Sequence, residues 1–226
     1  MSASAGNRHR CFELERVFGS DAPVAVHFAS QGIDDPQLEA LAAQAGVEPL
    51  GAEFPLPRRR EFLAGRLAAH AALAALGERG VVGRLQRAPV WPQGCSGSIS
   101  HANGWAVAVA ASARHWQALG IDLEAPIQPE LVPTLRRAFA DEEWQQCCEV
   151  ADPLLWARAW AAKEAAWKCA SALGPAPRLH ELVVAWESAE RGSLALRVPQ
   201  RGDTVVMQLH AACWSGQALV LAALAV

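Results

Sequence analysis

The sequence lacks a long apolar run. No stretch reaches the ~18 apolar residues that suggest a membrane helix, and the apolar stretch 218–226 is short enough for a buried strand. Residues 1–13 are polar, and no hydrophobic segment follows the basic residues Arg8 and Arg10. The sequence therefore predicts neither a membrane span nor a signal peptide.

Paired cysteine motifs are also missing. The six cysteines include no C-x-x-C pair, and no histidine stands at metal-site spacing from them. This pattern gives no support for a zinc site or a disulfide framework. We expect reduced, mostly buried thiols in a cytoplasmic protein.

The sequence has no excess of positive charge. Its 20 Lys and Arg stand against 23 Asp and Glu, and a net charge of −3 gives no electrostatic support for a nucleic-acid partner. We therefore expect no nucleic acid among its ligands. Basic residues cluster locally at Arg58, Arg59 and Arg60, in a patch that suits a small anion.

Apolar residues, in contrast, make up 52% of the 226 residues, enough for a sizeable core. The pattern predicts two long helices, one over 57–76 and one over 152–173 with Asp152 as its N-cap. Shorter helices are expected over 36–45 and 134–139 and from residue 141. Strands are expected over 22–29, 105–111, 119–124, 182–186, 193–198, 204–212 and 218–226. Each half of the chain thus mixes a long helix with strands, which predicts an α+β fold.

Two carboxylates share one predicted strand. Asp122 and Glu124 lie two residues apart in the segment GIDLE, so both point to the same face. Two adjacent carboxylates repel unless a cation or solvent separates them. The pair therefore indicates either a magnesium site or a solvated strand end.

A carboxylate and an ammonium lie one turn apart on the second long helix. Glu164 and Lys168 stand beside a stripe that includes Trp160 and Trp167. They form either a surface ion pair, worth ~0.2–0.5 kcal/mol, or a functional pair. In the second reading Glu164 is a metal ligand or general base, and Lys168 contacts a phosphate.

Residues 97–104, with the sequence GSISHANG, place Ser100 beside His101. The segment follows a Gly- and Pro-rich connection over 87–98, and we expect His101 in a turn. Its hydroxyl, imidazole and backbone N–H groups suit an anion, although a structural histidine is the plainer reading. A nucleophilic serine is less well supported, because the sequence has no G-x-S-x-G elbow and adjoining Ser and His rarely face each other.

In this order and spacing the segments resemble the phosphopantetheinyl transferases of the monomeric, two-half type. The similarity covers about residues 55–175 and is nearest to the enterobactin-synthetase branch. The pairing of GIDLE with WAAKEAAWK about forty residues later is the specific part. The matching pieces are RRREFLAGR at 58–66, RAPVW at 87–91, GSISHANG at 97–104, GIDLE at 120–124 and WAAKEAAWK at 160–168.

The resemblance implies a role for each matching residue. Asp122, Glu124 and Glu164 would hold Mg²⁺, which would grip the pyrophosphate of coenzyme A. Glu164, Lys168 and His101 would be catalytic, the last two as phosphate contacts. The other implied contacts to coenzyme A are Ser100, Arg87, Arg59 and Arg66. Which of residues 58–60 meets the 3′-phosphate, and whether Glu164 or a water is the base, stay open.

The resemblance also implies a pseudo-twofold pair of α+β halves, each a small antiparallel sheet packed on a long helix. The N-terminal half, residues 1–115, would serve coenzyme A and the carrier. The C-terminal half, residues 116–226, would hold magnesium and the catalytic residues. The activity implied is Mg²⁺-dependent transfer of the 4′-phosphopantetheine arm of coenzyme A to a serine of an apo acyl, peptidyl or aryl carrier protein, with release of 3′,5′-ADP.

The family further implies a monomer that serves siderophore or other secondary-metabolite synthesis. Which carrier and pathway it serves, and whether it accepts acylated coenzyme A, stay open. Three alternatives remain: a non-catalytic coenzyme A-binding or carrier-docking protein of the same fold, another magnesium-dependent phosphotransferase, and a serine hydrolase. The second is weakened because the sequence contains no P-loop and no kinase Gly-rich loop.

Overall fold

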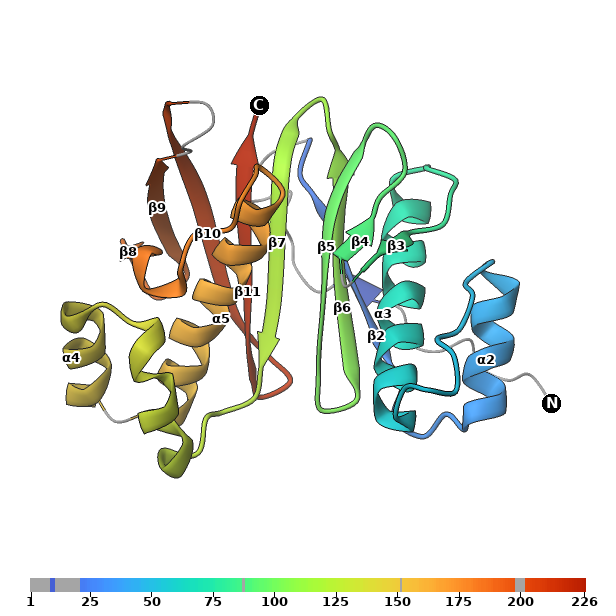
Figure 1. Ribbon diagram of the computed structural model, residues 1–226, viewed down its shortest axis with the longest axis horizontal. Coiled ribbons are helices and arrows are strands. Elements are labelled where there is room, and N and C mark those ends of the chain that lie inside the picture. Colours follow the sequence, from blue (N-terminus) through green and yellow to red (C-terminus); the bar gives the residue numbers. More distant parts are fainter. Residues whose placement is uncertain (1–8, 11–20, 87, 151, 198–201) are drawn as a thin grey trace. The chain divides into compact units, whose positions relative to one another are not determined.

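The computed structural model describes residues 9–10, 21–86, 88–150, 152–197 and 202–226. The chain divides into two compact units, Met1–His115 and Trp116–Val226 (Figure 1). Each unit contains an antiparallel sheet with a long helix packed against it. The predicted α+β class is confirmed.

Unit 1 is built on a four-stranded antiparallel sheet in the order β1 (His9–Arg10), β2 (Val24–Ala29), β6 (Trp105–Ser112) and β5 (Cys95–Ala102). Helix α3 (Leu56–Ala75) packs on this sheet, and α2 (Asp35–Gln44) packs on α3. A small hairpin, β3 (Gly83–Leu85) and β4 (Ala88–Val90), follows α3. The core of the unit joins the alanine- and leucine-rich side of α3 to the buried side chains of β2 and β6.

Unit 2 is built on a five-stranded antiparallel sheet. Its order is β7 (Trp116–Glu124), β11 (Gln217–Ala225), β10 (Thr204–Trp214), β9 (Arg191–Arg197) and β8 (Ala185–Trp186). Helix α5 (Pro153–Ser171) packs chiefly on β7 and β11, and the Asp152 side chain caps it by accepting a hydrogen bond from the Leu154 N–H at 2.9 Å. Between β7 and α5 the chain forms η1 (Pro129–Ala138) and α4 (Asp141–Val150), and η2 (Leu179–Glu181) follows α5.

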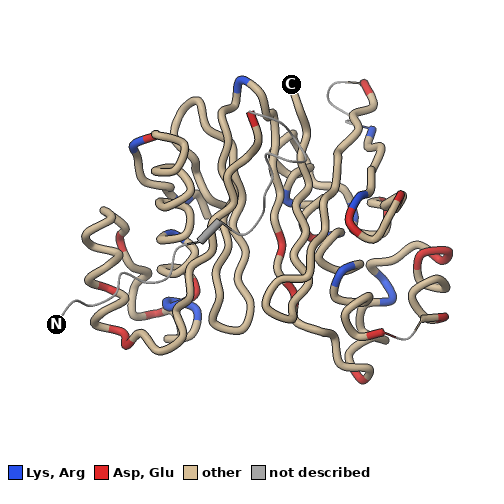
Figure 2. Tube along the Cα trace, turned by 180° about the vertical axis from the view of Figure 1, so that it is seen from behind, with Lys and Arg blue, Asp and Glu red and all other residues tan. Residues whose placement is uncertain are grey.

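Charged residues are concentrated on the helices and connections of both units. Figure 2 shows the strands to be mostly free of Lys, Arg, Asp and Glu. The two acidic residues near the end of β7 are therefore an exception that folding alone does not require. No helix among the described residues has the length and apolar character to cross a membrane.

Strand β7 and helix α5 meet closely at Gly120. A Cβ atom built on Gly120 would lie 1.8 Å from the carbonyl oxygen of Ala165 and 2.8 Å from the backbone nitrogen of Cys169. Only glycine leaves room for this approach. Since alternate strand residues share a face, Asp122 and Glu124 lie on the same side of β7 as Gly120, which is the side that α5 covers.

Several sequence-based boundaries were wrong. Within the expected connection over 87–98, residues 88–90 form β4 and residues 95–98 begin β5, and His101, expected in a turn, also lies in β5. The serines and glycines of β5 conceal its strand pattern. The expected helix 134–139 is the end of η1, a 3₁₀ segment that contains Pro133. Strand β7 begins three residues earlier than expected, and only 185–186 of the expected strand 182–186 is paired.

We predict that Gly120→Ala destabilises the chain by about 3 kcal/mol, because the added methyl group forces α5 away from β7. Urea unfolding measures this change. Gly83→Ala is the matched control, since its Cβ would meet Val90 at an ordinary 3.6 Å. Equal stability of both variants and the wild type would contradict the close approach.

Candidate active site

An acidic cluster in unit 2 lies where β7 and α5 meet. Asp122 and Glu124 come from β7, and Glu164 and Lys168 from α5. The Lys168 ammonium donates to Asp122 Oδ1 at 2.6 Å and to the Ile121 carbonyl at 3.1 Å. The Asp122 side chain is only 5% exposed, so this ion pair is largely shielded from water. The structure therefore brings together all four residues that the sequence singles out here.

The cluster carries more negative charge than Lys168 balances. Burial, the Asp122 charge and the Glu164 charge raise the pKa of Glu124 to about 7, against a hydrogen bond from Trp160 and the charge of Lys168, which lower it. Burial and Asp122 also raise the pKa of Glu164. Glu124 and Glu164 thus resist ionisation beside Asp122, which is the condition that a bound cation relieves.

The donor set fits magnesium in its chemistry. Three carboxylates supply the hard oxygen ligands that Mg²⁺ prefers. Their side chains are not gathered into a ligand shell, however: no group of three or more His, Cys, Asp or Glu side chains is close enough to hold a metal in the described ranges. The ammonium of Lys168 holds Asp122 instead. The predicted roles of these residues as metal ligands stay predictions.

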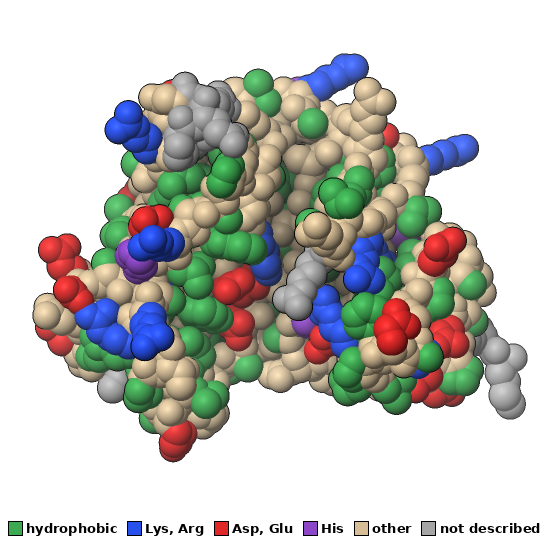
Figure 3. All heavy atoms as spheres, viewed as in Figure 1, with side chains coloured by type: hydrophobic (Ala, Val, Ile, Leu, Met, Phe, Trp, Pro, Cys, Tyr) green, Lys and Arg blue, Asp and Glu red, His purple; other side chains and the backbone are tan. Residues whose placement is uncertain are grey.

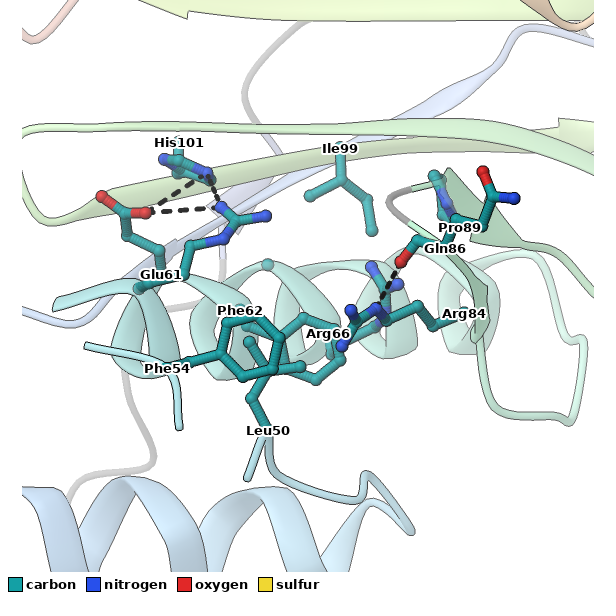
Figure 4. A pocket seen from close by; sticks show the side chains of 12 residues that line it. Leu50, Phe54, Glu61, Phe62, Arg66, Arg84, Gln86, Pro89, Ile99 and His101 are labelled. Carbon is teal, nitrogen blue, oxygen red and sulfur yellow. Dashed lines mark hydrogen bonds and ion pairs between the residues drawn. The ribbon is translucent and has the colours of Figure 1, made fainter. Parts of the chain in front are cut away.

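A second polar site lies in unit 1, in a pocket of about 470 Å³. It is lined by α3, the segment before α3, the β3–β4 hairpin and β5 (Figure 4). Arg58 Nη1 lies 3.0 Å from His101 Nε2 and 3.4 Å from Glu61 Oε2, and the Glu61 carboxylate lies 3.7 Å from the His101 ring. Figure 3 shows basic and histidine side chains together with an acidic one on the visible face of this unit.

Arg66 is the most deeply buried cation of this pocket, with 7% of its surface exposed. It donates to the Gly83 carbonyl at 3.0 Å, and its guanidinium lies 4.7 Å from the centre of the Phe62 ring. Burial, Arg84 and Arg58 lower its pKa to about 10. The pocket is thus a concentrated source of positive charge.

Not every predicted residue reaches this pocket. Arg59 pairs with Glu39 of α2 at 3.2 Å, and Arg60 forms an ion pair with Asp35, so Arg58 is the member of the 58–60 run that lines the pocket. Ser100 is buried and does not line it. Arg87 lies outside the described residues.

The positions of Ser100 and His101 weaken the hypothesis that the chain is a serine hydrolase. Both belong to β5, and neighbouring residues of a strand point to opposite faces. Ile99 and His101 face α3 and line the pocket, whereas Ser100 points to the other side of the sheet. The serine and the imidazole therefore do not form a nucleophile–base pair.

Sequence reasoning missed Glu61, Arg84 and Phe54, which also line the pocket. The i,i+3 spacing of Arg58 and Glu61 was available as a signal. Arg84 and Phe54 had none, because they reach the pocket only through the packing of the hairpin and the loop onto α3.

A buried ion pair between α5 and α4 also had no signal in the sequence. Lys163, 1% exposed, donates to Glu143 Oε2 at 2.6 Å and to the Leu182 carbonyl at 2.8 Å, and Glu143 Oε1 accepts the Val184 N–H at 3.2 Å. Burial lowers the pKa of Lys163, while Glu143 opposes this shift. The pair ties α4 and the segment after η2 to the middle of α5.

Two family models match the chain, one in each unit. The model described as the 4′-phosphopantetheinyl transferase N-terminal domain matches residues 52–111, and that of the 4′-phosphopantetheinyl transferase superfamily matches residues 118–222. The first range contains most of the pocket, and the second contains the whole acidic cluster. The chain belongs to the 4′-phosphopantetheinyl transferase superfamily, which confirms the resemblance seen in the sequence.

Curated relatives point the same way. The chain is 35% identical over 147 residues to the 4′-phosphopantetheinyl transferase Npt of Nocardia iowensis, covering 61% of this chain and 64% of that protein. It is 36% identical over 118 residues to enterobactin synthase component D of Salmonella typhi, covering 50% and 49%. The same component of Escherichia coli strain K12 is 34% identical over 138 residues, covering 59% and 65%. The chain therefore spans about half to two thirds of the length of these relatives.

We predict that Lys163→Met destabilises the chain by about 3–5 kcal/mol, because it leaves the Glu143 carboxylate enclosed without its cation. In the double variant Lys163→Met/Glu143→Gln much of this loss should return, since Gln still offers an acceptor to Val184. Urea unfolding of the single and double variants measures the coupling. Additive losses would contradict the buried pair.

The raised pKa of Glu124 predicts a pH dependence in metal-free buffer. Between its ordinary value of 4.5 and about 7 the folded chain binds this proton more tightly than the unfolded chain does. Protonation of Glu124 therefore stabilises the folded chain relative to the unfolded chain. This stabilisation is complete below about pH 4.5 and is lost as the pH rises through about 7. Glu124→Gln should then stabilise the chain more at about pH 8 than at about pH 5. A gain that is the same at both pH values, measured by urea unfolding with a chelator, would contradict the shift.

Proposed function

We propose that this chain transfers the 4′-phosphopantetheine arm of coenzyme A to a serine of an apo carrier protein, with Mg²⁺, and releases 3′,5′-ADP. One observation carries the proposal: in a member of this family, β7 and α5 bring Asp122, Glu124, Glu164 and Lys168 into one cluster. A plain surface ion pair would not account for the burial of Asp122.

Asp122, Glu124 and Glu164 would be the residues that hold magnesium. Their oxygen donors and their mutual repulsion support this choice. When bound, the ion would neutralise charge on the pyrophosphate of coenzyme A.

The carrier serine is a weak nucleophile at neutral pH and needs a base. The pKa of Glu164 is raised above its usual value, and this makes its carboxylate a stronger base for the hydroxyl proton. The serine oxygen would then form a bond to the phosphorus that bears the pantetheine arm, while the bond from that phosphorus to the oxygen of the departing 3′,5′-ADP breaks. A water beside Glu164 is the alternative base. Lys168, which donates to Asp122 and to the Ile121 carbonyl, would offer its remaining N–H group to the phosphates.

The pocket in unit 1 would bind the nucleotide part of coenzyme A. Its arginines, its apolar wall and the imidazole of His101 supply the contacts that phosphates and a planar base require. Arg58 and Arg66 are better placed for this role than Arg59, which pairs with Glu39. The parts predicted for Ser100 and Arg87 stay predictions.

The carrier protein would dock through an acidic helix on basic or apolar surface of this chain. The relatives named enterobactin synthase component D make a siderophore pathway the first to try. The monomeric state, the cytoplasmic location and the absence of a nucleic-acid partner stay predictions from the sequence.

Intact-protein mass spectrometry of an apo carrier, incubated with this chain, coenzyme A and Mg²⁺, tests the proposal. We expect the carrier to gain the mass of one phosphopantetheine arm. Asp122→Ala and Glu164→Ala should slow the gain roughly 100-fold or more, and a chelator should abolish it. Glu142→Ala, which removes an exposed acid of α4, is the matched control and should react like the wild type.

Two results would contradict parts of the proposal. Tight binding of coenzyme A without transfer to any of several carriers would favour the non-catalytic coenzyme A-binding or carrier-docking reading. Transfer that survives the chelator would remove magnesium from the proposal.

A further inference from the structure

Unit 2 contains a small cavity between α4, α5 and the segment that forms β8, three elements that lie side by side in Figure 1. Its volume is about 210 Å³, which holds a ligand of roughly ten non-hydrogen atoms at the packing density of a protein interior. Most of its lining is apolar and includes the aromatic rings of Phe139 and Trp186. None of the four residues of the acidic cluster lines it.

The cavity and the acidic cluster lie on opposite faces of α5. The helix contributes one stripe to the cavity, at spacings of three and four residues, formed by Leu155, Arg158, Ala159 and Ala162. At about 100° per residue, Glu164 points about 180° away from the centre of this stripe. The cavity is therefore separate from the site proposed for magnesium, and no step of the proposed reaction uses it.

The cavity carries one unbalanced positive charge. Its described lining contains one acid, Glu143, and one base, Arg158. The Glu143 carboxylate is neutralised by the buried ammonium of Lys163, which lies 2.6 Å from its Oε2. Burial and the Glu143 charge raise the pKa of Cys147 to about 11, so this thiol is neutral at physiological pH. The charge that remains is that of Arg158.

The guanidinium of Arg158 is held in place by one side. Its Nη1 donates to the Ala189 carbonyl at 2.9 Å, and its central carbon lies 4.7 Å from the centre of the Trp186 ring. Its Nε is buried, and the described residues offer it no acceptor and offer the guanidinium no carboxylate. Because Nε and Nη2 share the other edge of the guanidinium, this edge can hold a carboxylate through two parallel hydrogen bonds.

The surroundings of Arg158 place an anion in this cavity. Arg158 also borders a second depression, but Asp152 and Glu190 line that one, and their charges disfavour an anion there. The Arg158 charge acts on Cys147, a residue of the cavity between α4 and α5, and opposes the rise in the pKa of its thiol. The guanidinium therefore lies close enough to this cavity to attract a negative group inside it.

Charge and shape together define the class of ligand. A phosphate monoester carries about −1.5 to −2 at neutral pH, which one arginine does not balance. A neutral ring would fill the apolar space but leave the buried Nε without an acceptor. A carboxylate matches the single charge and the two-donor edge, and a ring attached to it matches the aromatic lining.

We propose that this cavity is a binding site for a small aromatic monocarboxylate, whose carboxylate pairs with Arg158 and whose ring lies between Phe139 and Trp186. Such a ligand contacts both helices, since α4 and α5 line the same cavity. Helix α4 buries a single residue of its own, Cys147, so the ligand also anchors a weakly packed helix. The proposal goes beyond the proposed transferase function and does not depend on it.

Calorimetric titration of the whole chain with benzoate tests the site. Benzamide has the same ring without the charge, and acetate has the same charge without the ring. The wild type should bind benzoate roughly tenfold more tightly than either. Arg158→Gln should lower the affinity for benzoate roughly tenfold or more, and Arg158→Lys should lower it less, because it keeps the charge but not the planar fork.

A second variant places the ligand in the cavity. Ala159→Leu fills the space while keeping a good helix former in α5, and it should abolish benzoate binding. Benzoate should raise the urea midpoint of the wild type but not that of Ala159→Leu. Arg137→Gln is the matched control, since Arg137 is exposed and does not line the cavity, and it should bind benzoate like the wild type.

Three results would overturn the proposal. The first is a wild type that does not bind benzoate at millimolar concentration. The second is equal affinity for benzoate and benzamide, because the guanidinium would then select nothing. The third is binding that survives both Arg158→Gln and Ala159→Leu, which would belong to another basic site such as the pocket of unit 1. If Arg158→Gln does not fold, Ala159→Leu and the comparison of benzoate with benzamide still decide.

Discussion

The close approach of β7 and α5 at Gly120 is the constraint on which the candidate active site depends. The backbone of α5 lies so close to Gly120 that a Cβ atom at this position would clash with it. At this separation Lys168 of α5 donates both to a backbone carbonyl and to a carboxylate of β7. Asp122 and Glu124 lie two residues apart on β7, so both face α5. Glu164 lies on α5, one helical turn before Lys168. A larger residue at position 120 would separate the acids from the helix that supplies their partners.

Two opposite electrostatic imbalances follow from the packing. In unit 2, carboxylates accumulate around one lysine, and the pKa of Glu124 rises to about 7. In unit 1, arginines accumulate around one glutamate, and the pKa of Arg66 falls to about 10. Neither imbalance stabilises the folded chain by itself. The first suits a cation and the second suits an anion.

The long helices were predictable from the sequence, and so was the placing of the two family motifs on a strand and a helix, because both are local. Asp152 and Gly174 bracket α5, and the segments GIDLE and WAAKEAAWK each keep their spacing in one element. Prediction from the sequence failed where a role depends on contacts between elements. Strand β5 was read as a turn because its serines and glycines hide the alternation. The pairing of Arg59 with Glu39 was not foreseen, and the contact of Arg59 to coenzyme A stays a prediction. Arg84 and the Glu143–Lys163 pair went unseen, since only the tertiary packing brings their partners near.

Calorimetric titration of coenzyme A into this chain, with Mg²⁺ and with a chelator, tests most directly whether the acidic cluster receives a cation together with its substrate. We predict that Mg²⁺ tightens the binding roughly tenfold in the wild type, and that Asp122→Asn removes this gain while leaving the metal-free affinity largely intact. Equal affinities with and without Mg²⁺ in the wild type would contradict the central claim, because the repulsion among the three carboxylates would then have no part in binding.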